Sequence, residues 1–360
     1  MKRIILLVVP FLLLMLAAVL ATSAFAANDQ PIGKAFQITT DPKYDRNPSF
    51  FRAADGTYWL FFTRGKDNRG IRDFQGYNPD LDYYDIYYRT ARSIPELQKV
   101  DENIIRLTPP DNAQRDISAF QGRDGKIWVF TSTGLGPGSQ RSVYFYIFDG
   151  SWNGPTLVPG TDYAAHISAL EHNGKIWVFF DIDYKLKVTS YDEAAHWSPP
   201  VTVAGPDATV AKAMVDDGNF YVVWTTSSGA GIYLSTSADG TNWSSTSNPI
   251  ASWPGASNWD PVLTKEKDTF RLFWAPDAGF KGQFIATSSS KKPTESTSWS
   301  HPVKLTTSSY NTNNWWDFWP QIYSDKGESW LFYTSERDKT GKERTDGNIW
   351  TLNVPESVIK

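Results

Sequence analysis

Residues 115–130 read RDISAFQGRDGKIWVF, and the pattern of this stretch sets the architecture of the whole chain. From Ile117 onward, apolar residues alternate with polar ones, which is the two-residue period of a half-buried strand. Asp124 and Gly125 form a hairpin-turn signal, because glycine accepts the positive φ that tight turns require. The run 127–130 is β-branched and aromatic, which favours a second strand. The stretch therefore predicts a β-hairpin.

The same hairpin pattern recurs about every 50 residues along the chain. The six copies begin at Asn47, Asp116, His166, Lys212, Asp260 and Trp319. Repeats of this length that contain strands are typical of the blades of a β-propeller. A β-sandwich is the alternative, and six copies of one hairpin pattern disfavour it.

The two ends of the chain complete the predicted ring. Residues 36–40 form a short strand before the first hairpin, and residues 347–354 give the last repeat a third strand without a fourth. The N-terminal strand can fill that place and so remove the exposed sheet edges. We therefore expect an all-β fold in which residues 27–360 form a single six-bladed β-propeller of four-stranded antiparallel blades, closed by the N-terminal strand.

Residues 1–26 have the features of a secretory signal peptide. Lys2 and Arg3 precede an apolar run over residues 4–20, and residues 24–26 read AFA, a small-x-small cleavage site. The alternative is an uncleaved N-terminal anchor. No later stretch is apolar enough to span a bilayer. We expect a secreted, cell-surface or periplasmic protein with no membrane span after cleavage.

Composition excludes several function classes. The chain has no cysteine, so disulfides and thiolate chemistry are absent. The net charge of −4 and the lack of a basic tail argue against a nucleic-acid partner. The four histidines are not at metal-ligand spacing. We expect a monomer without metal or cofactor.

Two stretches carry a turn motif. Residues 237–243 read SADGTNW, and residues 190–197 read SYDEAAHW with Ala194 in the place of the motif's glycine. Both resemble the Asp-box, or BNR repeat, of the sialidase-like propellers. The resemblance implies that Asp239 and Asp192 stabilise turns between third and fourth strands at the outer rim, away from the axis.

The first repeat resembles the sialidases more closely. Arg46, Asn47 and Pro48 are similar to the R-I-P that opens their first blade, and Arg64 falls where they carry a second arginine. The resemblance implies an exo-sialidase-like glycoside hydrolase with further arginines and a Tyr–Glu pair. Lys212 stands at the matching strand start of blade four, and the sequence does not single out the tyrosine.

A second resemblance involves the inner strands. The stretches that begin at Asp116 and Asp260, DIS and DPV, are similar to those of the arabinanase/xylosidase-type propeller hydrolases. Those enzymes have five blades and place Asp, Asp and Glu on three successive inner strands. Here Asn47, Asp116 and His166 occupy the three positions, so the glutamate is missing from its expected place.

Inner strands of a propeller begin near the axis at one face, where residues from distant repeats meet. The predicted catalytic residues are Asp116, Asp260, His166 and Glu336. The predicted substrate-binding residues are Arg46, Asn47, Arg64, Arg115, Lys212, Trp259, Trp316, Trp319 and Arg337. Indole rings beside carboxylates suit the C–H faces of sugars. The alternatives are a water-filled channel lined by polar groups and tryptophans wedged between blades.

Two long connections, residues 64–84 and 335–347, belong to blades that become neighbours when the ring closes. Long loops in compact folds are functional or disordered, so they could form a lip over the same face. Two hypotheses follow. The first is a secreted carbohydrate-active propeller, a sialidase-like or related glycoside hydrolase acting on glycans or glycoconjugates. The alternative is a non-catalytic cell-surface propeller that binds glycan or protein, because fold alone does not decide function.

Overall fold

The structure is a computed structural model. It describes residues 35–41, 44–65, 84–108, 113–134, 141–279, 282–306, 315–325, 327–337 and 346–355. The chain divides into two compact units, Met1–Pro31 and Ile32–Lys360. The first unit, and with it the predicted signal peptide, lies outside the described residues, as do most of the two long connections. No helix in the described ranges is long and apolar enough to cross a membrane.

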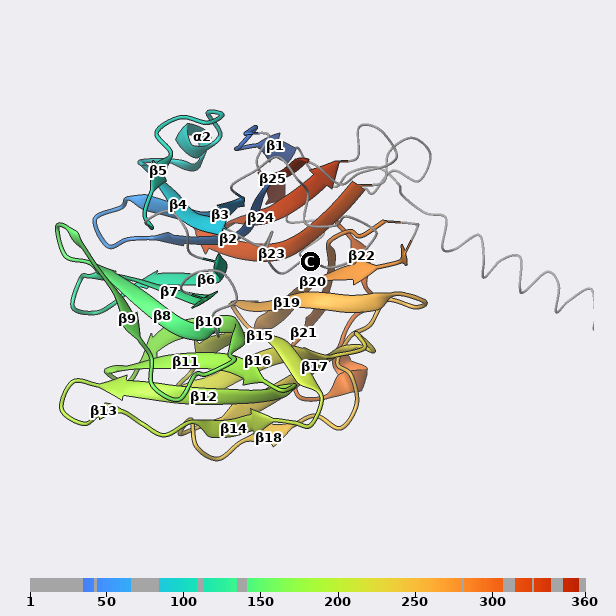
Figure 1. The fold of residues 1–360 in the computed structure, drawn as a ribbon. Helices are drawn as coiled ribbons and strands as arrows, with labels where there is room; N and C mark the ends of the chain where they lie inside the picture. Colours follow the sequence, from blue (N-terminus) through green and yellow to red (C-terminus); the bar gives the residue numbers. More distant parts are fainter. Residues whose placement is uncertain are drawn as a thin grey trace, which may run out of the picture. The chain divides into compact units, whose positions relative to one another are not determined.

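The second unit is a six-bladed β-propeller (Figure 1). The blades follow one another along the chain, and the strands of each blade are named from the inner strand outward. Blades one and two contain β2 (Asp45–Arg52), β3 (Tyr58–Gly65), β4 (Tyr84–Ala91) and β5 (Ile105–Arg106), then β6 (Ala113–Gln121), β7 (Ile127–Gly134), β8 (Ser142–Phe148) and β9 (Trp152–Leu157). Blades three and four contain β10 (Ala165–His172), β11 (Lys175–Ile182), β12 (Lys185–Asp192), β13 (His196–Trp197) and β14 (Val201–Ala204), then β15 (Ala208–Asp216), β16 (Asn219–Thr226), β17 (Ile232–Ser237) and β18 (Ser244–Ser245). Blades five and six contain β19 (Ser257–Glu266), β20 (Thr269–Asp277), β21 (Ala286–Ser290) and β22 (Val303–Lys304), then β23 (Trp315–Asp325), β24 (Glu328–Arg337), β25 (Asp346–Val354) and β1 (Ala35–Gln37).

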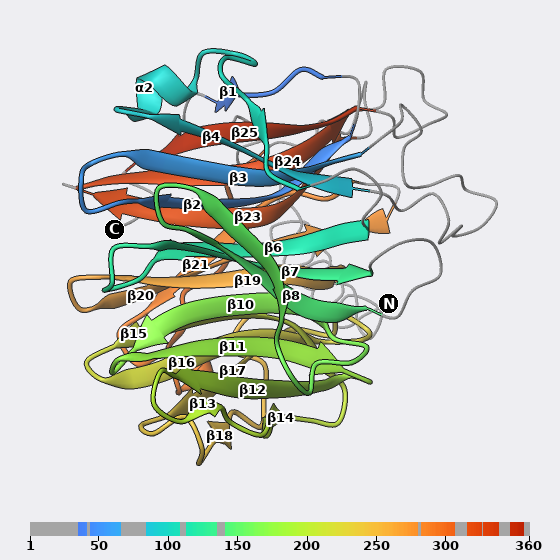
Figure 2. The ribbon, with the colours of Figure 1, turned by 60° about the vertical axis from the view of Figure 1, so that its left-hand side comes forward.

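Short helices and parallel bridges between neighbouring blades accompany the strands, and one such bridge joins Gln283 of blade five to Trp316 of blade six. The helix α2 (Ile94–Leu97) follows β4, and the 3-10 helix η3 (Ser296–Ser298) lies between β21 and β22. A parallel pair, Tyr84 with Ala113, joins blades one and two. Figure 2 shows the strands of blade three side by side, with β13 and β14 at its outer edge.

The predicted closure of the ring is confirmed. Phe36 of β1 pairs with Thr351 of β25, and the amide of Ile38 donates to the carbonyl of Ile349 at 2.8 Å. Figure 1 shows β1 beside β25, so the two ends of the chain meet in one blade. The N-terminal strand covers the outer edge of the last sheet and is its fourth strand, which the last repeat lacked in the sequence.

The hydrophobic core lies between neighbouring blades. Trp128 and Phe130 of blade two pack with Val178 and Phe180 of blade three. The opposite face of β11 presents Phe179 to blade four. Fully burying such a side chain contributes about 1.5–3 kcal/mol, so these layers supply much of the stability of the ring.

Every inner strand carries an irregularity near its start. The pairing register shifts at residues 46/49, 114/117, 165/168, 209/212, 259/262 and 318/321. A β-bulge of this kind bends the strand and redirects a side chain. Five of the six bulges contain a non-glycine residue with left-handed φ: Asn47 at 57°, His166 at 47°, Val210 at 49°, Asp260 at 52° and Trp319 at 51°.

The bulges correct the alignment of blade four. Val210, and not Lys212, occupies the position that matches His166 and Asp260. Lys212 stands two residues further along, where Ser168 stands in blade three. A β-branched residue with left-handed φ is a genuine outlier, and such strained residues gather at functional sites.

The turns that contain Asp192 and Asp239 join the third and fourth strands of blades three and four. Oδ1 of Asp239 accepts from the amides of Thr241 and Asn242, both at 2.8 Å. Oδ1 of Asp192 accepts from the amide of Ala194 at 2.9 Å. These hydrogen bonds stabilise the two turns, and neither aspartate lines the two cavities at the axis.

Candidate functional site

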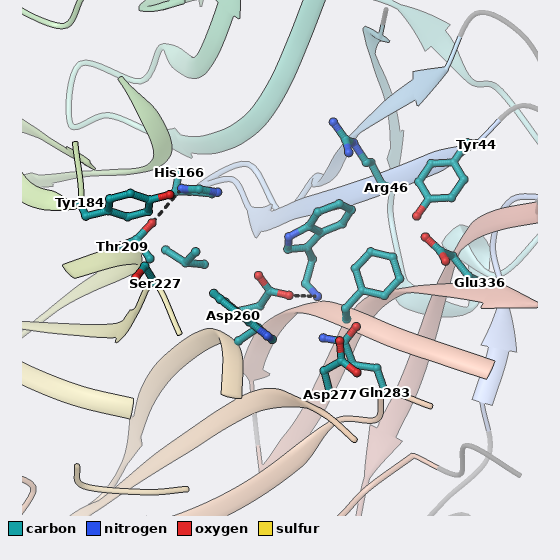
Figure 3. Close-up of a pocket in the computed structure, with 14 residues that line it drawn as sticks. Tyr44, Arg46, His166, Tyr184, Thr209, Ser227, Asp260, Asp277, Gln283 and Glu336 are labelled. Carbon is teal, nitrogen blue, oxygen red and sulfur yellow. Dashed lines mark hydrogen bonds between the residues drawn. The ribbon is translucent and has the colours of Figure 1, made fainter. Parts of the chain in front are cut away.

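The face where the inner strands begin contains a cavity of about 430 Å³. Five blades contribute to its wall, and all but the second are represented. The lining residues are Tyr44, Arg46, His166, Tyr184, Thr209, Val210, Ser227, Trp259, Asp260, Asp277, Gln283, Phe318, Trp319 and Glu336 (Figure 3). This volume falls within the range of small-molecule sites, and the wall combines aromatic faces with charges of both signs.

Arg46 is held between aromatic rings on one side of the cavity. Its guanidinium carbon lies 3.9 Å from the ring centre of Tyr84 and 5.1 Å from that of Trp319. Such cation–π contacts fix the side chain. Arg46 is therefore a positioned cation at the wall of the cavity.

Tyr44 and Glu336 lie together on the opposite side from His166, and Figure 3 shows the hydroxyl of Tyr44 directed toward the carboxylate. Gly347 makes room for this ring, since a Cβ at that position would lie 2.6 Å from Cε2 of Tyr44. Tyr44 was not predicted from the sequence. It stands two residues before Arg46, and alternate residues of a strand share a face, so that spacing was the available signal.

Asp260 lies on the floor of the cavity, in the left-handed bulge of β19. Its Oδ2 accepts a hydrogen bond from the amide of Trp319 in the next blade at 3.3 Å. Burial raises the pKa of Asp260 to about 6, although the Trp319 amide and the positive charge of His166 favour the ionised form. The carboxyl can therefore hold or release a proton near neutral pH.

A second, small cavity of about 20 Å³ adjoins the first and shares His166, Val210, Asp260 and Trp319 with it. This is room for about one water molecule. Asn47, Asp116 and Lys212 line only this inner cavity. The strand starts therefore converge as predicted, but they occupy two levels along the axis.

Asp116 is fully engaged with its neighbours. Its Oδ1 accepts from Nδ2 of Asn47 at 3.0 Å, and its Oδ2 accepts from Oγ of Ser132 and from the amide of His166, both at 2.9 Å. Burial opposes ionisation, but the charge of His166, the Ser132 hydroxyl and the charge of Arg46 outweigh it and hold the pKa of Asp116 at about 2. Asp116 is a permanent anion that joins blades one, two and three.

His166 and Lys212 balance this negative charge. Nδ1 of His166 lies 2.9 Å from Oδ1 of Asp181 and 3.2 Å from Oγ1 of Thr209. Burial disfavours protonation of His166, but the charge of Asp181, which also hydrogen-bonds to the ring, raises its pKa to about 9. Burial lowers the pKa of Lys212, whose Nζ donates to the carbonyl of Ile167 at 3.2 Å.

Several predicted binding residues lie elsewhere. Arg64 makes a two-point contact with Asp45, with Nε–Oδ1 at 2.6 Å and Nη2–Oδ2 at 2.8 Å, and contacts Asp41 at 2.8 Å. It lines neither cavity, and the same is true of Arg115 and of Trp316, which belongs to a hydrophobic core cluster.

The remaining predicted residue, Arg337, lies in β24, but its side chain is outside the described set. Among the described residues, no group of histidine and acidic side chains is arranged to hold a metal ion.

Replacing Asp116 with asparagine is expected to destabilise the protein by about 2–3 kcal/mol, because one amide oxygen cannot serve the three donors that the carboxylate satisfies. Urea unfolding followed by tryptophan fluorescence measures the loss. Ser132→Ala removes only one of the three hydrogen bonds to Asp116 and should lower the free energy of unfolding by less. Unchanged stability in Asp116→Asn, together with lost ligand binding, would mean that Asp116 contacts ligand and does not join blades.

Comparisons with known proteins support the fold. No protein-family model matches the sequence, and no curated protein is similar to it. A protein of unknown function from Dyadobacter fermentans has a similar structure, with a TM-score of 0.66 and 15% identity over 91% of this chain and 99% of that one. The NanB sialidase from Streptococcus pneumoniae gives 0.65 and 11% over 91% and 71%, and the phage phi92 endosialidase gives 0.62 and 10% over 90% and 69%. The chain therefore has the sialidase-like propeller fold.

Proposed function

We propose that this chain is a secreted carbohydrate-active propeller, a glycoside hydrolase whose site is the 430 Å³ cavity. The observation that carries the proposal is the placement of Asp260. A strained bulge presents this carboxyl on the cavity floor, its pKa is about 6, and the cavity wall also carries other carboxylates and two indole rings.

Glycoside hydrolysis requires two carboxyl groups in different protonation states. Asp260 would act as the general acid and give its proton to the glycosidic oxygen as the bond to the sugar carbon breaks. The carboxylate of Glu336, on another side of the cavity, would act on the opposite face of the sugar as base or nucleophile. Tyr44 beside it is the phenol that a sialidase-like variant of the reaction would use.

The rest of the wall suits a sugar. Trp259 and Trp319 offer faces on which the C–H side of a pyranose stacks. Gln283, Ser227 and Thr209 offer amide and hydroxyl groups for sugar hydroxyls. Among the described residues Arg46 is the one arginine that lines the cavity. Arg46 would pair with one anionic group of such a sugar.

One observation favours a non-catalytic glycan-binding propeller as the second candidate. The carboxylate of Asp260 accepts from the Trp319 amide and so also joins blades five and six. If the function of Asp260 is this structural hydrogen bond, the cavity has no general acid and would bind a glycan without cleaving it.

A screen of 4-nitrophenyl glycosides of hexoses, pentoses and N-acetylneuraminic acid separates the two candidates. We expect hydrolysis of at least one glycoside, and a loss of about 10²–10⁴-fold in kcat/KM for Glu336→Gln. The matched control is Asp216→Asn, which removes the charge of a surface partner of Lys265 at the opposite end of β15 from the cavity-lining Val210. Sugar binding without hydrolysis of any glycoside would favour the binding propeller, and neither binding nor hydrolysis would contradict both.

A further inference from the structure

Two exposed tyrosines lie at the end of blade three where its inner strand begins, Tyr163 next to blade two and Tyr184 next to blade four. Among the described residues, Tyr163 and Tyr184 are the two exposed large aromatic side chains, with 67% and 56% of their surface accessible. Tyr163 precedes β10, and Tyr184 is in the turn between β11 and β12. Ala165 pairs with Asp181, so both tyrosines lie at the end of the blade where the inner strands begin. Tyr184 also lines the cavity, beside His166 (Figure 3).

The backbone at Tyr184 is unfavourable for tyrosine. Ile182 pairs with Lys185, so Asp183 and Tyr184 form a two-residue hairpin loop, with φ of 50° and 56°. A loop with two positive φ values strongly prefers Asn-Gly. Glycine would fit the second position without steric cost, yet the chain places a bulky aromatic residue there.

Tyr163 occupies an equally unfavourable position in a different turn. The amide of Ala164 donates to the carbonyl of Thr161 at 3.0 Å, which makes Tyr163 the third residue of a β-turn. Its φ is 66°, and a positive φ at that place is the preference of glycine or asparagine. Bulky residues with left-handed φ are uncommon and gather at functional sites.

Both turns are held rigidly. The amide of Ala208 donates to the carbonyl of Tyr184 at 2.8 Å, and the amide of Tyr163 donates to the carbonyl of Arg141 at 2.7 Å. Oγ1 of Thr161 accepts from the amide of Val143 at 3.0 Å. The rings are therefore presented to solvent on fixed backbones, which lowers the entropic cost of binding.

Each tyrosine follows an exposed aspartate, Asp162 and Asp183. An aromatic face beside a carboxylate offers a sugar both a stacking surface and an acceptor for its hydroxyls. We propose that this tyrosine edge, made of Asp162, Tyr163, Asp183 and Tyr184, binds the units of a glycan chain that extend beyond the cavity. The ligand is then an oligosaccharide or polysaccharide, not a lone terminal sugar. This inference rests on the carbohydrate-binding role proposed for the cavity.

The double variant Tyr163→Gly, Tyr184→Gly tests the proposal, because glycine removes the rings and suits both backbone positions. Native affinity gels containing xylan, arabinan, galactan, polygalacturonate or polysialic acid measure binding. We expect at least one of these polysaccharides to retard the wild type, and the variant to bind it at least ten-fold more weakly. The variant should melt at the same or a higher temperature than the wild type.

Two further variants serve as controls. Tyr163→Phe, Tyr184→Phe keeps the stacking faces and should retain most of the binding. Lys267→Gly changes another exposed residue with positive φ, 53°, in the β19–β20 turn at the opposite end of its blade, and it should bind like the wild type.

Two results would overturn the inference: equal retardation of the glycine variant and the wild type, or no retardation of the wild type by any of the five polysaccharides. Hydrolysis of small glycosides together with either result would leave the hydrolase proposal standing. A third result is that a polysaccharide retards the wild type but not the glycine variant, and that no glycoside is hydrolysed. This result would support glycan binding by the two tyrosines and contradict the hydrolase proposal.

Discussion

Replacing Asp260 with asparagine is expected to lower kcat/KM for a glycoside by about 10²–10⁴-fold, because the variant cannot donate the proton that the leaving oxygen needs. The loss should be larger for an alkyl glycoside than for a 4-nitrophenyl glycoside, since a good leaving group depends less on the acid. The fold should persist, because Asp260 is outside the hydrophobic clusters between blades and the asparagine can keep an acceptor oxygen for the Trp319 amide. Kinetics with both substrates, alongside a thermal melt, measure the effect.

The same variant has a readout that needs no substrate. The pKa of Asp260 in the folded protein is about 6, above the ordinary 3.8, so its ionisation costs stability as the pH rises through about 6. Asp260→Asn does not have this cost. Its stability relative to the wild type should therefore improve between pH 4 and pH 8 in urea unfolding. A relative stability that falls over this range would mean that the buried carboxylate is favoured in its ionised form.

Replacing Asp45 with alanine is expected to destabilise the protein by about 3–5 kcal/mol, because it leaves the buried guanidinium of Arg64 without its two-point partner. The side chain of Asp45 is 0% exposed and that of Arg64 is 9% exposed. Urea unfolding measures the change. Asp41→Ala is the matched control, since Asp41 contacts the same guanidinium from a 28% exposed position and should cost less than about 1 kcal/mol.

The alternative role of Arg64 predicts the reverse pattern. If Arg64 held an anionic ligand, as the resemblance to sialidases implied, Asp45→Ala would leave the stability nearly unchanged and alter ligand affinity. That result would contradict the assignment of this arginine to the fold.

The fold was predictable because each blade repeats one local pattern. The turn at Asp124 and Gly125 and the strand after it are set by nearby residues, and the repeat spacing implied the ring. The pairing of β1 with β25 followed from the count of strands, since one blade otherwise had an open edge.

The site was predictable only in part, because bulges and cross-strand partners are not visible in a local pattern. Val210 stands in the bulge of β15 where His166 and Asp260 stand in their blades. An apolar residue gave no sign of a site position, so Lys212 was aligned there, two residues too late. Arg64 faces Asp45 across the hairpin, and that register would have shown its partner. Tyr184 was missed because a hairpin loop gives no reason to expect an aromatic residue.

The pH dependence of kcat/KM for wild type and Asp260→Asn is the sharpest test of Asp260 as the general acid. A general acid is active only when protonated, so the wild-type value should fall as the pH rises through about 6. His166, with a pKa of about 9, stays protonated across that range. We expect Asp260→Asn to lose this fall in kcat/KM near pH 6. The variant should keep a low kcat/KM that is constant between about pH 5 and pH 8. If kcat/KM of the variant still fell near pH 6, the assignment of Asp260 as general acid would be contradicted, because another group would then supply the proton.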